Sequence, residues 1–120
     1  MIYLIYGAER PRLLNEMQAV LAAQLKKYPA LTIFRFSTED YSPKRLEEAL
    51  CGQILLAAKF IVVLDGLWAL AREIFLPHLP SLDRSPNLYL LIENELEPDG
   101  LAPIVAVGGR VKEVKKRFDR

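Results

Sequence analysis

Hydrophobic residues occur along this chain in two regular patterns, and each pattern predicts one kind of secondary structure. Short, uninterrupted runs of apolar and β-branched residues are typical of strands that are buried on both faces of a parallel sheet. We therefore expect five strands, the last of them from a weaker alternating pattern. They occupy residues 2–6, 31–36, 60–64, 87–92 and 110–114.

Between these runs, apolar residues recur at intervals of three and four, which is the period of an amphipathic helix. The longest such segment covers residues 9–28 and opens with Glu9 and Pro11. A second helix is expected after Ser42, a good N-cap residue, with Pro43 at the first helical position.

Three further signals concern the ends of helices. Gly52 is expected to end or bend the second helix, and Pro77 and Pro80 are expected to stop a third helix at residues 67–76. Residues 101–107 suit either a strand or a helix, because a β-branched run is followed there by two glycines.

The alternation of strands and helices predicts an α/β fold. Because connections between parallel strands of one sheet are right-handed, the pattern indicates a three-layer sandwich around a five-stranded parallel sheet. The 120 residues have the length of one ordinary domain. We expect residues 1–120 to form that single domain.

Composition excludes several functional classes. Sixteen Lys and Arg against fifteen Asp and Glu leave a net charge of +1, too small for binding nucleic acid by bulk attraction to phosphate. One cysteine excludes an internal disulfide, and a single cysteine with a single histidine argues against a zinc site of the usual ligands. No apolar run reaches membrane-spanning length and no leader pattern opens the chain. A cytoplasmic protein without cofactor or metal is expected.

Ligands of open α/β sheets bind beyond the carboxyl ends of the strands, so functional side chains are expected there. The first predicted strand is followed by Gly7, Ala8, Glu9 and Arg10. A phosphate-binding Walker A loop needs several glycines, a lysine and a hydroxyl residue, and this loop has one glycine and neither of the others. It is a degenerate Walker A position, at which we do not expect nucleotide binding.

Asp65 follows the third apolar run and has three possible interpretations. The pattern is Walker B-like, suited to holding Mg²⁺, and it also matches the phosphoacceptor of a response-regulator receiver. Both chemistries need further acidic residues, but Gly66 follows Asp65 and the first strand is followed only by Glu9. The simplest interpretation is that Asp65 caps the helix that begins near Leu67.

Two other reactive residues stand apart from any recognisable constellation. Cys51 follows Leu50 on an apolar helix face, and we expect a buried, inert thiol. His78 lies between two prolines and is expected to be a turn residue. The sequence contains no evident catalytic triad.

Leu55 and Leu56 lie in the short connection that leads to the strand at Phe60. Connections run over the surface because their backbone groups need water. Two adjacent large apolar side chains there either cover the edge of the sheet or form an exposed anchor for another protein. The hydrophobic pattern leaves both interpretations open.

The order and spacing of these segments resemble the first domain of the delta subunit of the bacterial DNA polymerase III clamp loader. The resemblance covers nearly the whole chain, although no single motif is diagnostic. It is carried, in order, by residues 2–7, 35–36, 39–40, 42, 46–50, 55–64, 90–93 and 109–114.

The resemblance implies a P-loop NTPase or AAA+-like fold without a functional P-loop, and a component of the DNA polymerase III holoenzyme without intrinsic enzymatic activity. By position, the hydrophobic pair that this family inserts into a pocket of the sliding clamp falls on Leu55 and Leu56. The implied partners are the sliding clamp (beta subunit) and, in a full-length protein, the other clamp-loader subunits. Contact with DNA would be indirect, and no membrane is involved.

The chain departs from the family pattern at two points. The second anchor position is usually Phe, so the smaller Leu56 implies weaker binding to a clamp. The family continues into a lid and a helical collar, so the chain is either the first domain of a longer protein or a stand-alone relative. The alternatives are a degenerate nucleotide-binding or phosphoreceiver-like regulatory domain that uses Asp65, and a module that self-associates through its apolar connection.

Overall fold

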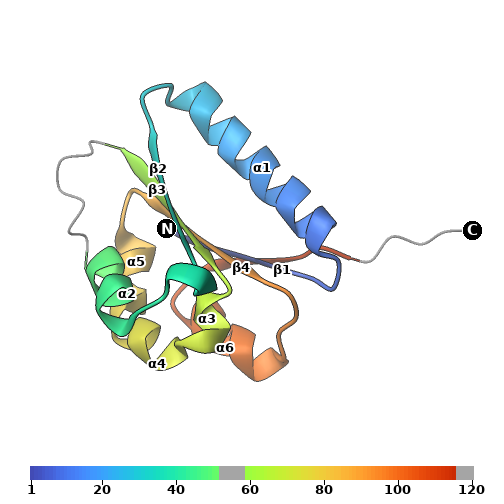
Figure 1. Cartoon of the computed structure of the whole chain (residues 1–120), viewed down its shortest axis with the longest axis vertical. Coiled ribbons are helices and arrows are strands. Elements are labelled where there is room, and N and C mark those ends of the chain that lie inside the picture. The colour runs from blue at the N-terminus through green and yellow to red at the C-terminus, as the bar shows by residue number, and fades with distance from the viewer. Residues whose placement is uncertain (52–58, 116–120) are drawn as a thin grey trace, which may run out of the picture.

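The computed structural model describes residues 1–51 and 59–115 of the chain. Its centre is a five-stranded sheet in which all neighbouring strands are parallel, in the order β2-β3-β4-β1-β5 (Figure 1). The predicted α/β fold with a five-stranded parallel sheet is confirmed. The strands are β1 (Ile2–Tyr6), β2 (Thr32–Ser37), β3 (Phe60–Asp65), β4 (Leu88–Glu93) and β5 (Arg110–Glu113).

Helices cover both faces of the sheet, which makes it the middle of three layers (Figure 1). One face is covered by the long helix α1 (Arg10–Lys27), and shorter helices pack on the other. Within the described ranges, no helix combines the length and the apolar character needed to cross a bilayer. The shorter helices are α2 (Pro43–Leu50), α3 (Leu67–Leu70), α4 (Arg72–Phe75), α5 (Leu79–Arg84) and α6 (Pro98–Ala106), with 3-10 helices η1 (Thr38–Asp40) and η2 (Leu76–His78) in the connections.

The two central strands β3 and β4 explain why apolar runs mark this sheet. Successive side chains of a strand point to opposite faces, so a strand covered on both sides needs apolar residues at every position. In β3, Ile61 and Val63 belong to the buried cluster under α1, whereas Val62 and Leu64 belong to the cluster under the shorter helices. Each face of the sheet therefore has its own hydrophobic core.

The start of α2 is as predicted. The Ser42 hydroxyl accepts a hydrogen bond from the backbone N–H of Arg45 at 3.1 Å, and Pro43 holds the first helical position, where no N–H is needed. The helix buries Leu46, Ala49 and Leu50 against the sheet. Gly52, expected to end it, lies outside the described residues.

The predicted helix at residues 67–76 is wrong in two respects. It is interrupted at Ala71, whose φ of −137° and ψ of 44° are not helical, so that α3 and α4 are separate turns. Pro77 and Pro80 do not stop the helical region, because each stands in the first turn of a new helix, η2 or α5. The first residues of a helix have no intrahelical use for an N–H, so a proline is tolerated there.

The segment that suited either a strand or a helix is helical in the structure. It forms most of α6, which begins at Pro98 and buries Ile104. Gly108 follows with a φ of +94°, a left-handed conformation that ends helices and favours glycine. This backbone turn leads directly into β5.

Candidate functional site

The strand order makes the carboxyl edge of the sheet the expected position of a functional site. From β1 the chain crosses to α1 on one face, whereas from β4, its neighbour in the sheet, it crosses to α6 on the other face. Ligands of open α/β sheets bind at such a point of divergence. The side chains gathered there are Arg10, Asp65 and Glu93.

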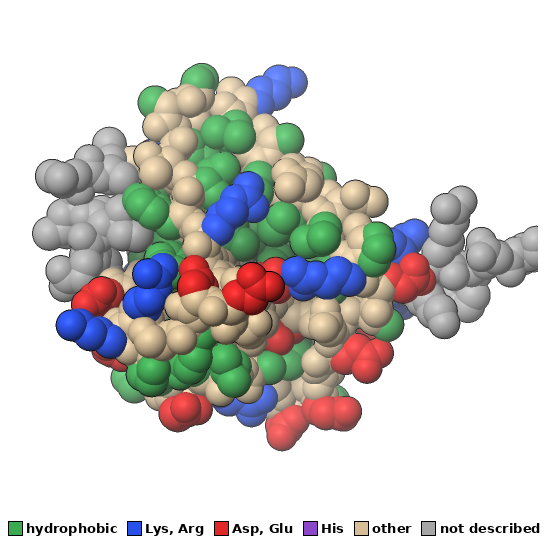
Figure 2. All heavy atoms as spheres, in the orientation of Figure 1, with side chains coloured by type: hydrophobic (Ala, Val, Ile, Leu, Met, Phe, Trp, Pro, Cys, Tyr) green, Lys and Arg blue, Asp and Glu red, His purple; other side chains and the backbone are tan. Residues whose placement is uncertain are grey.

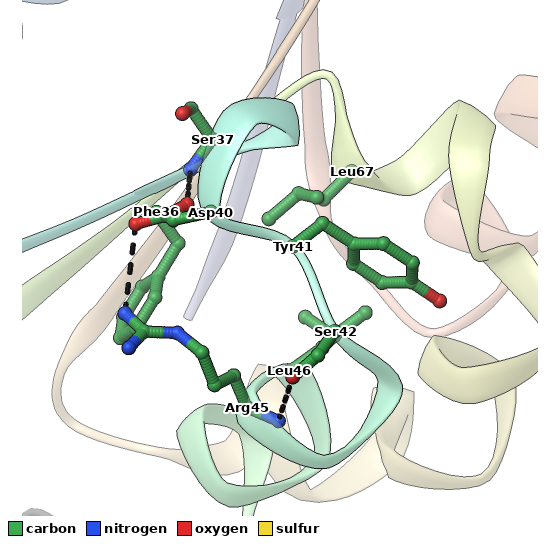
Figure 3. Close-up of a pocket in the computed structure, with 8 residues that line it drawn as sticks. All are labelled: Phe36, Ser37, Asp40, Tyr41, Ser42, Arg45, Leu46 and Leu67. Carbon is green, nitrogen blue, oxygen red and sulfur yellow. Dashed lines mark hydrogen bonds and ion pairs between the residues drawn. The ribbon is translucent and has the colours of Figure 1, made fainter.

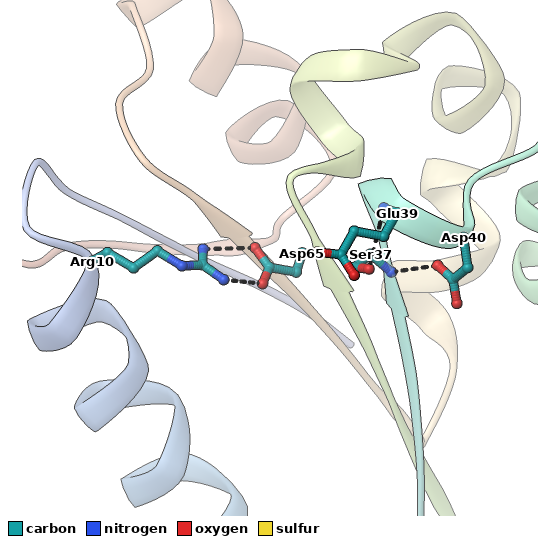
Figure 4. A network of polar contacts seen from close by, with 5 residues as sticks. All are labelled: Arg10, Ser37, Glu39, Asp40 and Asp65. Carbon is teal, nitrogen blue, oxygen red and sulfur yellow. Dashed lines mark hydrogen bonds and ion pairs between the residues drawn. The ribbon is translucent and has the colours of Figure 1, made fainter.

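Arg10 and Asp65 form an ion pair across this edge. The guanidinium comes from the first turn of α1 and the carboxylate from the last residue of β3 (Figure 4). Nη1 lies 2.9 Å from Oδ1, and Nη2 contacts Oδ2, so each of the two nitrogens binds one oxygen. The hydrogen bonds to Asp65 raise the pKa of Arg10. The predicted role of Asp65 as a helix cap is wrong, because its carboxylate binds Arg10.

The loop after β1 is held by the protein's own backbone. The N–H of Gly7 donates to the carbonyl oxygen of Asn94 at 2.8 Å, and the carbonyl of Glu9 accepts from the N–H groups of Arg12 and Leu13. A Cβ at Gly7 would overlap the carbonyl oxygen of Val114. The glycine is therefore explained by the close approach of the chain after β5.

Glu93 performs the capping role that the sequence assigned to Asp65. Its carboxylate, 5% exposed at the end of β4, accepts from the backbone N–H of Ala69 in α3 at 3.1 Å. Burial raises the pKa of Glu93, opposed by hydrogen bonds from Ala69 and Trp68 and assisted by the negative charge of Asp65. The sequence signal was present, since an acidic residue ends the buried run of β4, but nothing local showed which helix it would reach.

A hollow of about 250 Å³ lies beside Asp65, between α1 and the ends of β2 and β3. Leu14, Met17 and Phe36 supply apolar walls, and Arg35 also lines the hollow. Figure 2 shows this face of the molecule, with hydrophobic side chains in the hollow and a band of acidic and basic side chains below it. The volume falls below the roughly 300–1,000 Å³ typical of small-molecule sites.

A smaller depression between η1 and α2 is lined by polar groups that bind one another. The backbone N–H of Ser37 donates to Asp40 at 2.9 Å, and Asp40 pairs with Arg45 at 3.5 Å (Figure 3). Its volume of about 10 Å³ has room for no more than about one water molecule. These polar groups therefore stabilise the turn between β2 and α2.

Cys51 and His78 differ from their predicted environments. Cys51 is exposed, so the expectation of a buried thiol is wrong. The buried stripe of α2 is formed by Leu46, Ala49 and Leu50, and Cys51 follows the last helical residue. His78 ends η2, but its ring is not isolated, because Nε2 lies 2.6 Å from Oε1 of Glu47.

Leu55 and Leu56, the predicted anchor for a partner, lie outside the described residues. The described chain on either side shows only that their segment joins α2 to β3. Of the other predicted site residues, the structure brings Arg10 to Asp65 and keeps Gly7, Ala8 and Glu9 in the loop after β1.

No protein-family model matches this chain, and no curated protein matches it. The fold and the site together define a class: an α/β domain with an all-parallel sheet, whose carboxyl edge carries an internal ion pair.

Proposed function

We propose that this chain is a non-catalytic AAA+-like domain of the clamp-loader delta type, which binds a sliding clamp through Leu55 and Leu56. The proposal starts from the sequence resemblance. It is supported by the parallel α/β fold and by the arrangement of the sheet's carboxyl edge.

The ion pair between Arg10 and Asp65 is the observation that supports a non-catalytic role for the domain. A bound nucleotide in an α/β sheet needs free backbone N–H groups and a cation facing its phosphates. Here Arg10 binds the carboxylate of Asp65, and the N–H of Gly7 binds Asn94. The same contacts argue against Asp65 as a phosphoacceptor, because its two oxygens already bind a guanidinium.

The proposed binding to a sliding clamp depends on the apolar side chains of two adjacent leucines, Leu55 and Leu56. An apolar side chain that moves from water into a pocket contributes about 1.5–3 kcal/mol, and such central anchors dominate an interface. Clamp opening follows only if the domain binds the opened ring more tightly than the closed one, because a ligand shifts an equilibrium by its difference in affinity.

The test is calorimetric titration of a bacterial sliding clamp with the protein and with a Leu55→Ala, Leu56→Ala double variant. We expect the double variant to bind about a hundredfold more weakly or worse, since every 1.4 kcal/mol is tenfold. The matched control is Leu70→Ala with Leu76→Ala, which removes the same atoms from leucines that are 50% and 44% exposed. Its affinity should equal that of the parent protein.

Unchanged affinity in the Leu55 and Leu56 variant, with cooperative melting retained, contradicts the assigned site. Loss of cooperative melting would instead show that the two leucines belong to the core. A rise in melting temperature on addition of ATP and Mg²⁺ would favour the nucleotide-binding alternative. Sedimentation of the protein alone tests self-association.

A further inference from the structure

Three side chains of metal-binding type meet where α2 ends beside η2. Glu47 lies on α2, Cys51 is the C-cap residue four positions later, and His78 is the last residue of η2. Oε1 of Glu47 lies 2.6 Å from Nε2 of His78 and 3.5 Å from Sγ of Cys51. All three ligand atoms lie within 4.8 Å of one another.

The two contacts follow from the packing of α2. Side chains four residues apart lie on the same side of a helix, which places Glu47 directly beside Cys51. The side of α2 that carries Leu46, Ala49 and Leu50 is buried, so this pair remains near the surface, where η2 reaches it. The Glu47 carboxylate accepts from the thiol of Cys51 and contacts the ring of His78, which keeps the three groups together.

A thiolate, an imidazole and a carboxylate are ligands that Zn²⁺ accepts. Their bonds to zinc are about 2.0–2.3 Å long, so ligand atoms around a tetrahedral zinc lie about 3–4 Å apart. The separation of Oε1 from Sγ, 3.5 Å, falls in this range, and that of Oε1 from Nε2, 2.6 Å, would widen by a few tenths of an ångström to admit an ion. A site with sulfur and nitrogen ligands favours zinc over magnesium or calcium, which prefer oxygen.

The cluster is also accessible. Cys51 is exposed, and the side chains of Glu47 and His78 are 49% and 22% exposed. An ion can therefore reach the ligands without opening either hydrophobic core.

We propose that Glu47, Cys51 and His78 bind a single zinc ion, with solvent water in the fourth position. The ion bonds to Oε1, Sγ and Nε2, and the Cys51 thiol releases its proton to solvent when the sulfur coordinates. The bound ion fastens the end of α2 to η2. This proposal does not depend on the clamp-binding function.

Signals from a bound metal ion can be assigned to single residues, because the 120 residues contain one cysteine and one histidine. Titration of the protein with Co²⁺, a spectroscopic substitute for zinc, should give a thiolate-to-cobalt charge-transfer band at one ion per chain. Because no other thiol exists, the band can come only from Cys51. In parallel, the imidazole NMR signals of His78 should move when Zn²⁺ is added, which tests the second ligand without any substitution.

The variants Glu47→Gln, Cys51→Ser and His78→Gln should each weaken zinc binding by more than about tenfold, since even outer partners of metal sites give losses of that size. Glu48→Gln is the matched control, because it removes the same charge from the next, exposed residue of α2 and should bind as the parent does. Melting of each variant in the presence of a chelator checks the fold.

Zinc should raise the melting temperature of the parent and of the Glu48→Gln variant but not of the other three. The proposal is overturned if no charge-transfer band forms. It is equally overturned if the His78 signals stay in place, or if Glu47→Gln and His78→Gln bind zinc as tightly as the parent, which would leave a lone thiol as the ligand.

Discussion

Arg10 and Asp65, 55 positions apart in the sequence, form a two-point ion pair across the carboxyl end of β4. β4 lies between β1 and β3 in the sheet, so the pair connects the start of α1 to a strand with which β1 makes no hydrogen bonds. The contact places a positive and a negative group at the point of the fold where ligands of related architectures bind.

A double-mutant cycle with Arg10→Gln and Asp65→Asn should give a coupling free energy of about 0.5–1 kcal/mol. The two contacts between the guanidinium and the carboxylate favour the pair, but the side chains of Arg10 and Asp65 are 46% and 24% exposed, so solvent screens the attraction. The coupling should decrease at high salt. Urea unfolding followed by the fluorescence of Trp68, the single tryptophan, measures it.

The pair between Asp40 and Arg45 is the control for this cycle. It is longer, at 3.5 Å, and more exposed, at 47% and 54%, so its coupling should be close to zero. Equal coupling energies in the two cycles would show that the Arg10 contact has no special strength.

Glu93→Gln should change how stability depends on pH. Burial raises the pKa of Glu93 above the ordinary value of 4.5, so the folded protein binds this proton more tightly than the unfolded chain does. The stabilisation from that proton is complete below pH 4.5 and is lost as the pH rises through the folded pKa. A glutamine does not titrate, so the stability of Glu93→Gln relative to the parent should increase over this range and then level off.

Unfolding experiments at a series of pH values from acidic to neutral measure this difference. Glu95→Gln removes an exposed carboxylate from the following loop and reports the effect of losing a charge alone. A pH-independent difference between Glu93→Gln and the parent would contradict the assigned cause.

Gly7→Ala should lower the free energy of unfolding by about 1–3 kcal/mol, the usual cost of overpacking. The added methyl group would overlap the backbone carbonyl of Val114, which cannot rotate away as a side chain can. Ala8→Ser, at the next and exposed position, should change stability by less than about 0.5 kcal/mol. A neutral Gly7→Ala substitution would mean that the chain after β5 moves aside.

Trp68→Phe should cost about 1–3 kcal/mol. The indole Nε1 donates to the carbonyl oxygen of Gly100 at 2.9 Å in a buried position, and phenylalanine leaves that oxygen without its partner. The edge-to-face contact with Phe75, at 5.5 Å between ring centres, is of a kind that phenylalanine can keep. Circular dichroism melting measures the loss, and an unchanged melting temperature would show that the hydrogen bond adds no stability.

The predicted strands and the helices α1 and α2 show how much structure the local hydrophobic pattern can predict. An apolar run such as β3 predicts a strand because both faces of a central strand are buried. Ser42 and Pro43 predict the start of α2 because capping needs only neighbouring residues. The region from Ala71 to α5 was misread, since whether a proline stops a helix or begins the next one depends on what the following turn packs against.

The sequence by itself determined the class of fold, because strand and helix periods are set by neighbours a few residues apart. The tertiary structure alone decided which polar groups meet. Asp65 binds Arg10 rather than its own helix, Glu93 reaches Ala69 across 24 positions, and Glu47 meets His78 across 31. Such pairings depend on the order of the strands and the packing of the helices, which no local spacing encodes.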